Sequence, residues 1–211
     1  MALVEGEYCT RTHQVCDRWV DEGSEFLPQT RCAKFRPSKC IDDKVHKRFC
    51  IDVDEYTPPD DKLPANYQSW TMASQTCRSL GKRLCTESEW NFACEGEEML
   101  PYPYGYDRNN TLCNFDLTDL MNTKGKLKDW RKPSSSLDKC TSPFGVRNMV
   151  GNIDEWVFRE GGMLTPFRSA LKGGWWMAAR NRCRPATTAH DEYYKDTQTG
   201  FRCCKDAPKR Q

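Results

Sequence analysis

The segment of residues 173–190, GGWWMAARNRCRPATTAH, gathers side chains that either carry out chemistry or hold a partner. Tryptophan and arginine are the residue types that most often anchor protein interfaces. The alternative is that the tryptophans lie in the core under stacked guanidinium groups, while the arginines neutralise Asp154 and Glu155. Both interpretations can hold together, with one tryptophan buried and the other exposed. We predict a partner-binding surface made of Trp175, Trp176, Arg180, Arg182, Arg184 and His190.

Other chemistry in this segment is sparse. The sequence contains no visible set of nucleophile, base and orienting residue, and no phosphate-binding loop. His190 with Asp191 or Glu192 is an incomplete iron site, because non-haem iron usually needs two histidines and a carboxylate. A lone histidine beside Thr187 and Thr188 is more often a hydrogen-bonded structural residue than a metal ligand.

The composition is that of a globular protein with mixed surface charge. The 211 residues include 32 Lys and Arg against 30 Asp and Glu, a net charge of +2, and the two signs are interspersed. A nucleic-acid partner or an anionic membrane is therefore not implied. No apolar run approaches the roughly 18 residues that a membrane span needs.

The 13 cysteines are scattered singly along the chain, not grouped as paired zinc knuckles. Such a number is typical of disulfides formed in an oxidising compartment. We therefore expect a periplasmic or extracellular protein from which an export signal has been removed. The alternative is that the cysteines are reduced and buried as small apolar residues. Because the count is odd, at least one thiol is free or paired between chains.

Capping signals predict two helices. Thr71 can cap a first helix that ends at Gly81. Thr86 and Glu89 form a capping box for a second helix that ends at Gly96.

The strand signals are short. Residues 154–158, 169–176 and 200–204 are the strand candidates. Residues 1–60 are predicted to be loop-rich and pinned by cysteines, and the stretch after Glu97 forms long irregular loops rich in Pro, Gly, Asn, Asp and Ser.

Four motifs, in this order, resemble the sulfatase-modifying-factor family, that of the formylglycine-generating enzyme: GKRLCTESEWNFACEG, NMVGNIDEW, LKGGWW and GFRC. The resemblance runs from about Phe49 to Cys204. It implies an α+β, C-type-lectin-like fold that is loop-rich, low in regular secondary structure and stapled by disulfides. We expect residues 1–48 to be a cysteine-rich extension packed on the domain, and residues 49–211 to be the formylglycine-generating-enzyme-like domain.

The resemblance also implies structural calcium. Oxygen ligands from amides, carbonyls and carboxylates suit this ion. The alternative is that Asn148, Asn152 and Glu155 only cap turns. The first expected site consists of the side chains of Asn148 and Glu155 with the carbonyls of Gly151 and Ile153. The second consists of Asn114, the carbonyl of Phe115, and Asp129, which is one residue off the family spacing.

Disulfide pairing follows in part from the resemblance, which pairs Cys77 with Cys203. The family partner of Cys94 falls on Pro185 here, so Cys183 is a neighbouring substitute. Two further pairs are expected: Cys113 with Cys140, around the second calcium candidate, and Cys85 with Cys204.

The family's known activity is oxidation of a substrate cysteine to formylglycine with copper(I) held by two nearby cysteines. Soft thiolates suit copper(I), and two of them can hold it linearly. The first thiol position is Ala178 in this sequence, and Cys183 matches the second only if no gap is placed. We therefore expect no copper.

The resemblance implies a catalytically silent, calcium-braced binding protein. Some bacterial relatives without the dithiol serve as immunity proteins, which neutralise a secreted antibacterial toxin such as a lipase effector of type VI secretion. The alternative function is a copper- or iron-dependent oxidase or hydroxylase acting on a peptide or small molecule. A carbohydrate-binding module ranks last, because only the analogy of fold and exposed aromatics suggests it.

Overall fold

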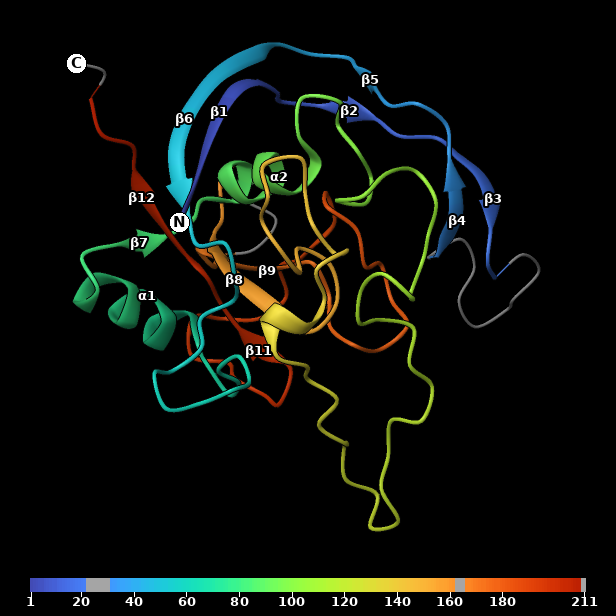
Figure 1. The fold of residues 1–211 in the computed structure, drawn as a ribbon, viewed down its shortest axis with the longest axis vertical. Coiled ribbons are helices and arrows are strands. Elements are labelled where there is room, and N and C mark those ends of the chain that lie inside the picture. The colour runs from blue at the N-terminus through green and yellow to red at the C-terminus, as the bar shows by residue number, and fades with distance from the viewer. Residues whose placement is uncertain (22–30, 162–165, 210–211) are drawn as a thin grey trace.

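The structure is a computed structural model that describes residues 1–21, 31–161 and 166–209. Its longest strands, β1 (Ala2–Cys9) and β6 (Lys44–Ile51), pair antiparallel along their whole length. They form the curved pair at the upper left of Figure 1. The sheet order is β1-β6-β12-β7, with β12 at Cys203–Asp206 and β7 at Arg83–Leu84.

The prediction that residues 1–60 are loop-rich was wrong at both ends of that region. These two strands bury few apolar side chains: Val4, Tyr8, Cys9, Phe49 and Ile51. The strands exist because they pair over a long distance in sequence, which no local signal reports. β6 also runs across residues 48 and 49 and pairs with β12, so one sheet joins both expected parts of the chain.

A second sheet lies near the centre of the molecule in Figure 1, with the order β10-β9-β8-β11. Its strands are β8 (Asp154–Phe158), β9 (Ser169–Lys172), β10 (Ala186–Thr187) and β11 (Thr199–Gly200). The strand predicted at 154–158 is confirmed. The strand predicted at 169–176 stops at Lys172, and the one predicted at 200–204 is divided between β11 and β12.

β9 stops because two glycines follow it. Gly173 and Gly174 have φ of +84° and +71°, in the left-handed region that favours glycine. A Cβ at Gly173 would lie 2.8 Å from the Met149 carbonyl oxygen, so the turn also needs the space.

Two small two-stranded sheets extend the amino-terminal region toward the right of Figure 1. One pairs β2 (Thr12–His13) with β5 (Lys39–Cys40), and the other pairs β3 (Cys16–Trp19) with β4 (Cys32–Phe35). Disulfides Cys9–Cys40 and Cys16–Cys32 hold this region.

The first helix, α1 (Trp70–Ser79), has its cap two residues before the predicted one. Ser69 is the cap residue, and its Oγ accepts the backbone N–H of Met72 at 3.2 Å. Thr71 instead lies inside the helix, where its hydroxyl donates to the carbonyl of Glu192 at 3.0 Å. The cap prediction was therefore wrong, although the helix exists.

The second helix, α2 (Glu87–Glu95), has the predicted capping box of Thr86 and Glu89 and ends at Gly96. It buries Trp90, Phe92, Ala93 and Cys94 in the larger of two main core clusters. A single 3₁₀ turn, η1 (Ser134–Ser136), interrupts the long loops that follow. The fold is α+β and loop-rich, as the sequence predicted.

Candidate functional site

The two tryptophans of the segment 173–190 have different surroundings. Trp176 has an exposed fraction of 0% and belongs to the core, while Trp175 is partly exposed. Their rings meet edge to face with centroids 5.0 Å apart. The prediction of a surface role was therefore wrong for Trp176, whose ring has no area left for a partner.

Asn181 fixes the turn that follows the tryptophans. Its side chain is fully buried, donates to the carbonyl of Trp175 at 2.7 Å, and accepts the N–H of Ala179 at 3.0 Å. Arg108 donates to the same amide oxygen at 3.2 Å and forms a two-contact ion pair with Asp116. Sequence reasoning missed Asn181 and Arg108, because the contact between them spans 73 positions and no local pattern marks either residue.

The three arginines of the segment are held differently. Arg184 forms a two-contact ion pair with buried Glu95 and donates to the carbonyl of Cys9 at 2.6 Å. Arg182 lies over the ring of Phe35 at 5.3 Å, and Arg180 is exposed. The structure describes no ion pair with a carboxylate for either Arg180 or Arg182.

The alternative interpretation of these arginines was also wrong. Among the described residues, none of the three pairs with Asp154 or Glu155. The partner of Glu155 is Arg202, which comes from the GFRC motif.

A buried charge cluster lies behind Arg184. Burial raises the pKa of Glu95 to about 7, although Arg184 opposes the shift. Burial likewise lowers the pKa of Lys172 to about 7, and its Nζ donates to the carbonyl of Arg184 at 2.6 Å. Burial also lowers the pKa of Arg182.

Two hollows flank residues 180–185. The larger, about 510 Å³ and here called the arginine basin, is lined by Thr10, Arg11, Thr12, His13, Gln14, Arg180, Arg182, Arg184 and Pro185. The smaller, about 220 Å³, has Asp154, Trp175, Met177 and Thr187 among its lining residues. The two hollows share Arg180 and Pro185 in their linings.

His190 lies apart from both hollows. Its ring stacks on Tyr194 with centroids 3.7 Å apart and planes inclined by 9°. The structure therefore does not bring His190 together with the arginines.

Two asparagines in the expected calcium motifs have buried oxygens without a partner. Asn148 Oδ1 and Asn114 Oδ1 accept no hydrogen bond within the described part of the chain. Their amide nitrogens are used: Asn148 donates to Glu55 at 3.0 Å and Asn114 donates to Asn152 at 2.9 Å. Buried polar atoms are rarely left unpaired, so these oxygens fit a bound cation.

The two carboxylates expected to bind calcium are engaged elsewhere. Glu155 accepts from Arg202 through both oxygens and from Trp90 Nε1 at 2.8 Å. Asp129 pairs with Arg131 at a half-exposed position. No group of three or more His, Cys, Asp or Glu suited to a metal occurs in the described residues.

Glu55 accepts hydrogen bonds from two of the asparagines in the first calcium motif, and sequence reasoning missed it. Its carboxylate accepts from Ser134 Oγ at 2.6 Å, Asn148 at 3.0 Å and Asn152 at 2.9 Å. Burial raises the pKa of Glu55 to about 7.

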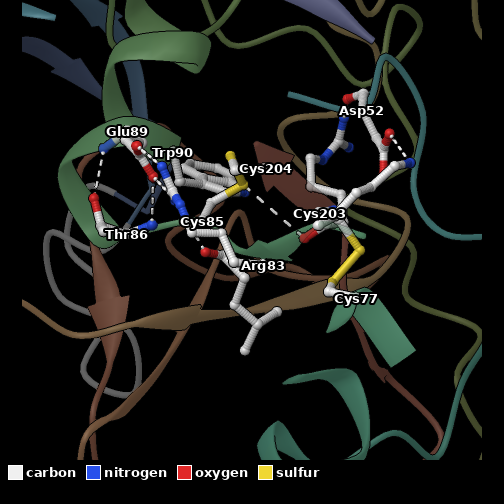
Figure 2. Close-up of a disulfide and its surroundings, with 12 residues drawn as sticks. Asp52, Cys77, Arg83, Cys85, Thr86, Glu89, Trp90, Cys203 and Cys204 are labelled. Carbon is white, nitrogen blue, oxygen red and sulfur yellow. Dashed lines mark hydrogen bonds and ion pairs between the residues drawn. A yellow bond between two sulfur atoms is a disulfide. The ribbon is translucent and has the colours of Figure 1, made fainter. Parts of the chain in front are cut away.

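The structure joins the four cysteine pairs expected from the sequence: Cys77–Cys203, Cys85–Cys204, Cys94–Cys183 and Cys113–Cys140. Figure 2 shows Cys203 directed toward Cys77, and Cys204 toward Cys85 beside Trp90. Cys50 is the one cysteine without a disulfide. The sulfur of Cys183 is therefore bonded to Cys94 and is not a free thiolate.

A family model for the sulfatase-modifying factor enzyme 1-like domain matches residues 14–207. The chain belongs to this family. Among its curated relatives, the inactive C-alpha-formylglycine-generating enzyme 2 of Bos taurus is 28% identical over 158 residues, which cover 69% of this chain and 51% of that protein. The serine/threonine-protein kinase Pkn1 of Chlamydia trachomatis is 30% identical over 166 residues, covering 69% of this chain and 24% of that protein.

This family member thus spans about half, or less, of the length of these curated relatives. The crystal structure of CarF has the same fold, with a TM-score of 0.68 at 14% identity and coverage of 98% of both chains.

The six disulfides indicate a protein of an oxidising compartment. No helix in the described residues is long and apolar enough to cross a membrane.

Proposed function

We propose that this chain is a catalytically silent member of the formylglycine-generating-enzyme family that acts by binding another protein. The observation that carries the proposal is the Cys94–Cys183 disulfide. Copper(I) chemistry in this family needs two thiolates, and this chain has Ala178 at the first position. Cys183, which matches the second position only if no gap is placed, is bonded to Cys94. The similarity to a relative named as inactive supports the same conclusion.

The surface around residues 175–187 is suited to binding. A rigid scaffold pays little entropy when a partner docks, and this segment is fixed by Asn181, by the disulfide at Cys183 and by the ion pair of Arg184. Partly exposed Trp175 lies in one hollow and Arg182 in the other, with Arg180 shared between them. These are residue types typical of interface anchors.

A narrower form of the proposal is immunity. The partner would then be a secreted antibacterial toxin, such as a lipase effector, that meets this protein in the periplasm or outside the cell. This form depends on the resemblance to silent bacterial relatives and on the oxidising compartment that six disulfides favour.

Calcium has a structural role in the proposal. The orphaned oxygens of Asn148 and Asn114 fit a hard cation, and the carbonyls of Gly151, Ile153 and Phe115 are the further ligands expected. A bound ion would be coordinated by these buried oxygens and would hold the loops that carry them in place. Of the two expected carboxylates only Glu155 is fully buried, and Arg202 already donates to both of its oxygens.

The test of silence uses the oxidised, calcium-loaded protein with copper(I), oxygen and a cysteine-containing peptide. We expect no formylglycine product by mass spectrometry and no copper(I) retained against a bicinchoninate competitor. Stoichiometric copper with conversion of the peptide would establish the alternative oxidase function and refute the proposal. Iron analysis of the purified protein tests the other form of that alternative.

The test of binding is affinity capture with candidate toxins, comparing the wild type with Trp175→Ala and Arg182→Gln. We expect both variants to weaken capture while the melting temperature stays close to that of the wild type. Unchanged capture by both variants would place the interface elsewhere on the molecule.

A further inference from the structure

The arginine basin carries an excess of positive charge. Four of its lining residues are arginines (Arg11, Arg180, Arg182 and Arg184), His13 lies beside them, and no Asp or Glu lines it. The whole protein is almost neutral at +2, so this concentration is local. A cleft lined by one sign of charge attracts ligands of the opposite sign.

Only part of this charge is neutralised by neighbours. Arg184 is paired with Glu95, and Arg11 lies 3.6 Å from Asp42 at an exposed position, where an ion pair contributes little. Arg180 and Arg182 have no carboxylate partner in the part of the chain that the structure describes. Two guanidinium groups are therefore available to an incoming anion.

Arg182 is the better anchor of the two. Its Nε is buried and has no hydrogen-bond partner within the described ranges, and its guanidinium lies over the face of Phe35 at 5.3 Å. Because this Nε is shielded from solvent, a ligand oxygen would meet the partly exposed remainder of the Arg182 side chain. Stacking on the ring restricts the guanidinium, so its planar fork needs little further ordering.

Both walls of the basin are fixed in place. On one wall, Cys183 is bonded to Cys94, and its N–H donates to the carbonyl of Pro101 at 2.9 Å. On the other, Cys9 is bonded to Cys40, and Gln14 donates to the carbonyl of Met99 at 3.1 Å. Arg184 joins the two walls through the carbonyls of residues 9 and 10.

We propose that the arginine basin binds a carboxylate side chain on a protein partner, with the Arg182 guanidinium as its principal contact. This inference rests on the proposed binding function and names the chemistry of the partner. A fork of parallel N–H donors matches the two oxygens of a carboxylate. The basin, at about 510 Å³, is much larger than a free inorganic anion, and its polar lining of Thr10, Thr12 and Gln14 suits the neutral parts of a polypeptide.

The experiment follows arginine Nε–Hε resonances by NMR in the full, oxidised chain. The probes are the tripeptides acetyl-Glu-Asp-Glu-amide and acetyl-Gln-Asn-Gln-amide, titrated at low salt. The resonance missing from the Arg182→Gln spectrum identifies Arg182. We expect the acidic tripeptide to shift this resonance saturably, the neutral tripeptide to leave it unmoved, and added salt to weaken the effect.

Variants of Arg182 provide the matched comparison. Their affinity for the acidic tripeptide is measured from the backbone amide shifts of the other residues around the basin. Arg182→Gln is expected to weaken binding of the acidic tripeptide about tenfold or more. Arg182→Lys, which keeps the charge and loses the fork, is expected to give an intermediate affinity. Arg78→Gln removes one positive charge on α1, outside the basin lining, and is expected to change nothing.

Three results would overturn the inference: equal binding of the neutral tripeptide, full affinity in Arg182→Gln, or inorganic phosphate binding more tightly than the acidic tripeptide. The last result would assign the basin to a free oxyanion. Because these titrations need neither copper nor a toxin, their failure is separate from the failure of the proposed function. If the copper assay detects oxidase activity, the tripeptide titrations remain a valid test of the basin.

Discussion

Arg202 and Glu155 form a fully buried ion pair through two contacts, Nε to Oε2 at 2.7 Å and Nη2 to Oε1 at 2.6 Å. Arg202 also donates to the carbonyls of Asp52, Val53 and Arg147, so the pair connects the carboxyl-terminal region to loops on both sides of the core. Removing one member leaves the other charge buried and unpaired. The ion pair therefore affects stability mainly through the buried, unpaired charge that remains when one partner is removed.

Replacing Arg202 by Met is expected to lower the free energy of unfolding by about 3–5 kcal/mol, measured by urea denaturation. The control is Arg36→Met, which removes an exposed ion pair with Asp17 and should cost about 1 kcal/mol or less. Similar losses in both variants would show that burial does not decide the effect.

Calcium is expected to stabilise the wild type. Binding to the folded state alone contributes RT ln(1 + [Ca]/Kd), about 2.7 kcal/mol at 100 times the Kd. Chelation with EGTA should therefore lower the melting temperature, and Asn148→Ala should remove much of this response. Asn122→Ala, in an exposed loop, is the control that should keep it. No response in the wild type would mean that the orphaned oxygens are not calcium ligands.

One thiol per chain is expected in the unreduced protein. Unfolding in denaturant and labelling with a maleimide should modify Cys50 alone, because the other twelve cysteines form six disulfides. Peptide mapping identifies the labelled residue. Labelling of Cys183 in native protein would contradict the pairing on which the proposed function depends.

The neighbouring tryptophans give a matched pair of variants. Trp176→Ala should lower the free energy of unfolding by about 3–5 kcal/mol, because it removes a large side chain from the core. Trp175→Ala should cost about 1 kcal/mol or less, because its side chain is partly exposed. Thermal melts of the two variants check this difference. Equal losses of stability would mean that both tryptophans belong to the core.

The free energy of unfolding is expected to rise at alkaline pH because of Lys172. Burial lowers its pKa from 10.5 to about 7 in the folded protein, against the attraction of Glu87 and Glu95 and with the repulsion of Arg184 and Arg182. Between these two pKa values the unfolded chain binds more protons than the folded one. Stability contributed by Lys172 therefore increases as pH rises from about 7 toward 10 and is lost as pH falls back through 7.

Lys172→Met should flatten this pH dependence, measured by urea unfolding at pH 7 and pH 9. Both proteins carry Cys50→Ser, which prevents disulfide exchange by the free thiol at high pH. Lys124→Met, in an exposed loop, should retain the slope of the parent protein. An unchanged slope in Lys172→Met would assign the titration to another group.

Local signals in the sequence predicted what depends on neighbouring residues. The capping box of Thr86 and Glu89 is complete within one helical turn, so α2 was placed correctly. The ion pair of Arg184 with Glu95 joins residues 89 positions apart, and the strand partners β1 and β6 meet across the amino-terminal loops. Nothing in a local pattern distinguishes Arg184, which is paired, from Arg182, which is not.

The site was predicted in the same uneven way. Residue types singled out the segment 173–190, but the burial of Trp176 and the stacking of His190 on Tyr194 depend on tertiary packing. Asn181, which orders the whole turn, has no signature beyond its own side chain.

The adjacent cysteines at 203 and 204 bond to partners 126 and 119 residues earlier, and the two bridges lie in separate core clusters. Neighbouring side chains of a strand point to opposite faces, so exchanging the two partners would require β12 to slip by one position and turn its inner face outward. Correct oxidation is therefore a covalent check on strand alignment. It can be completed only after residue 204 has been synthesised.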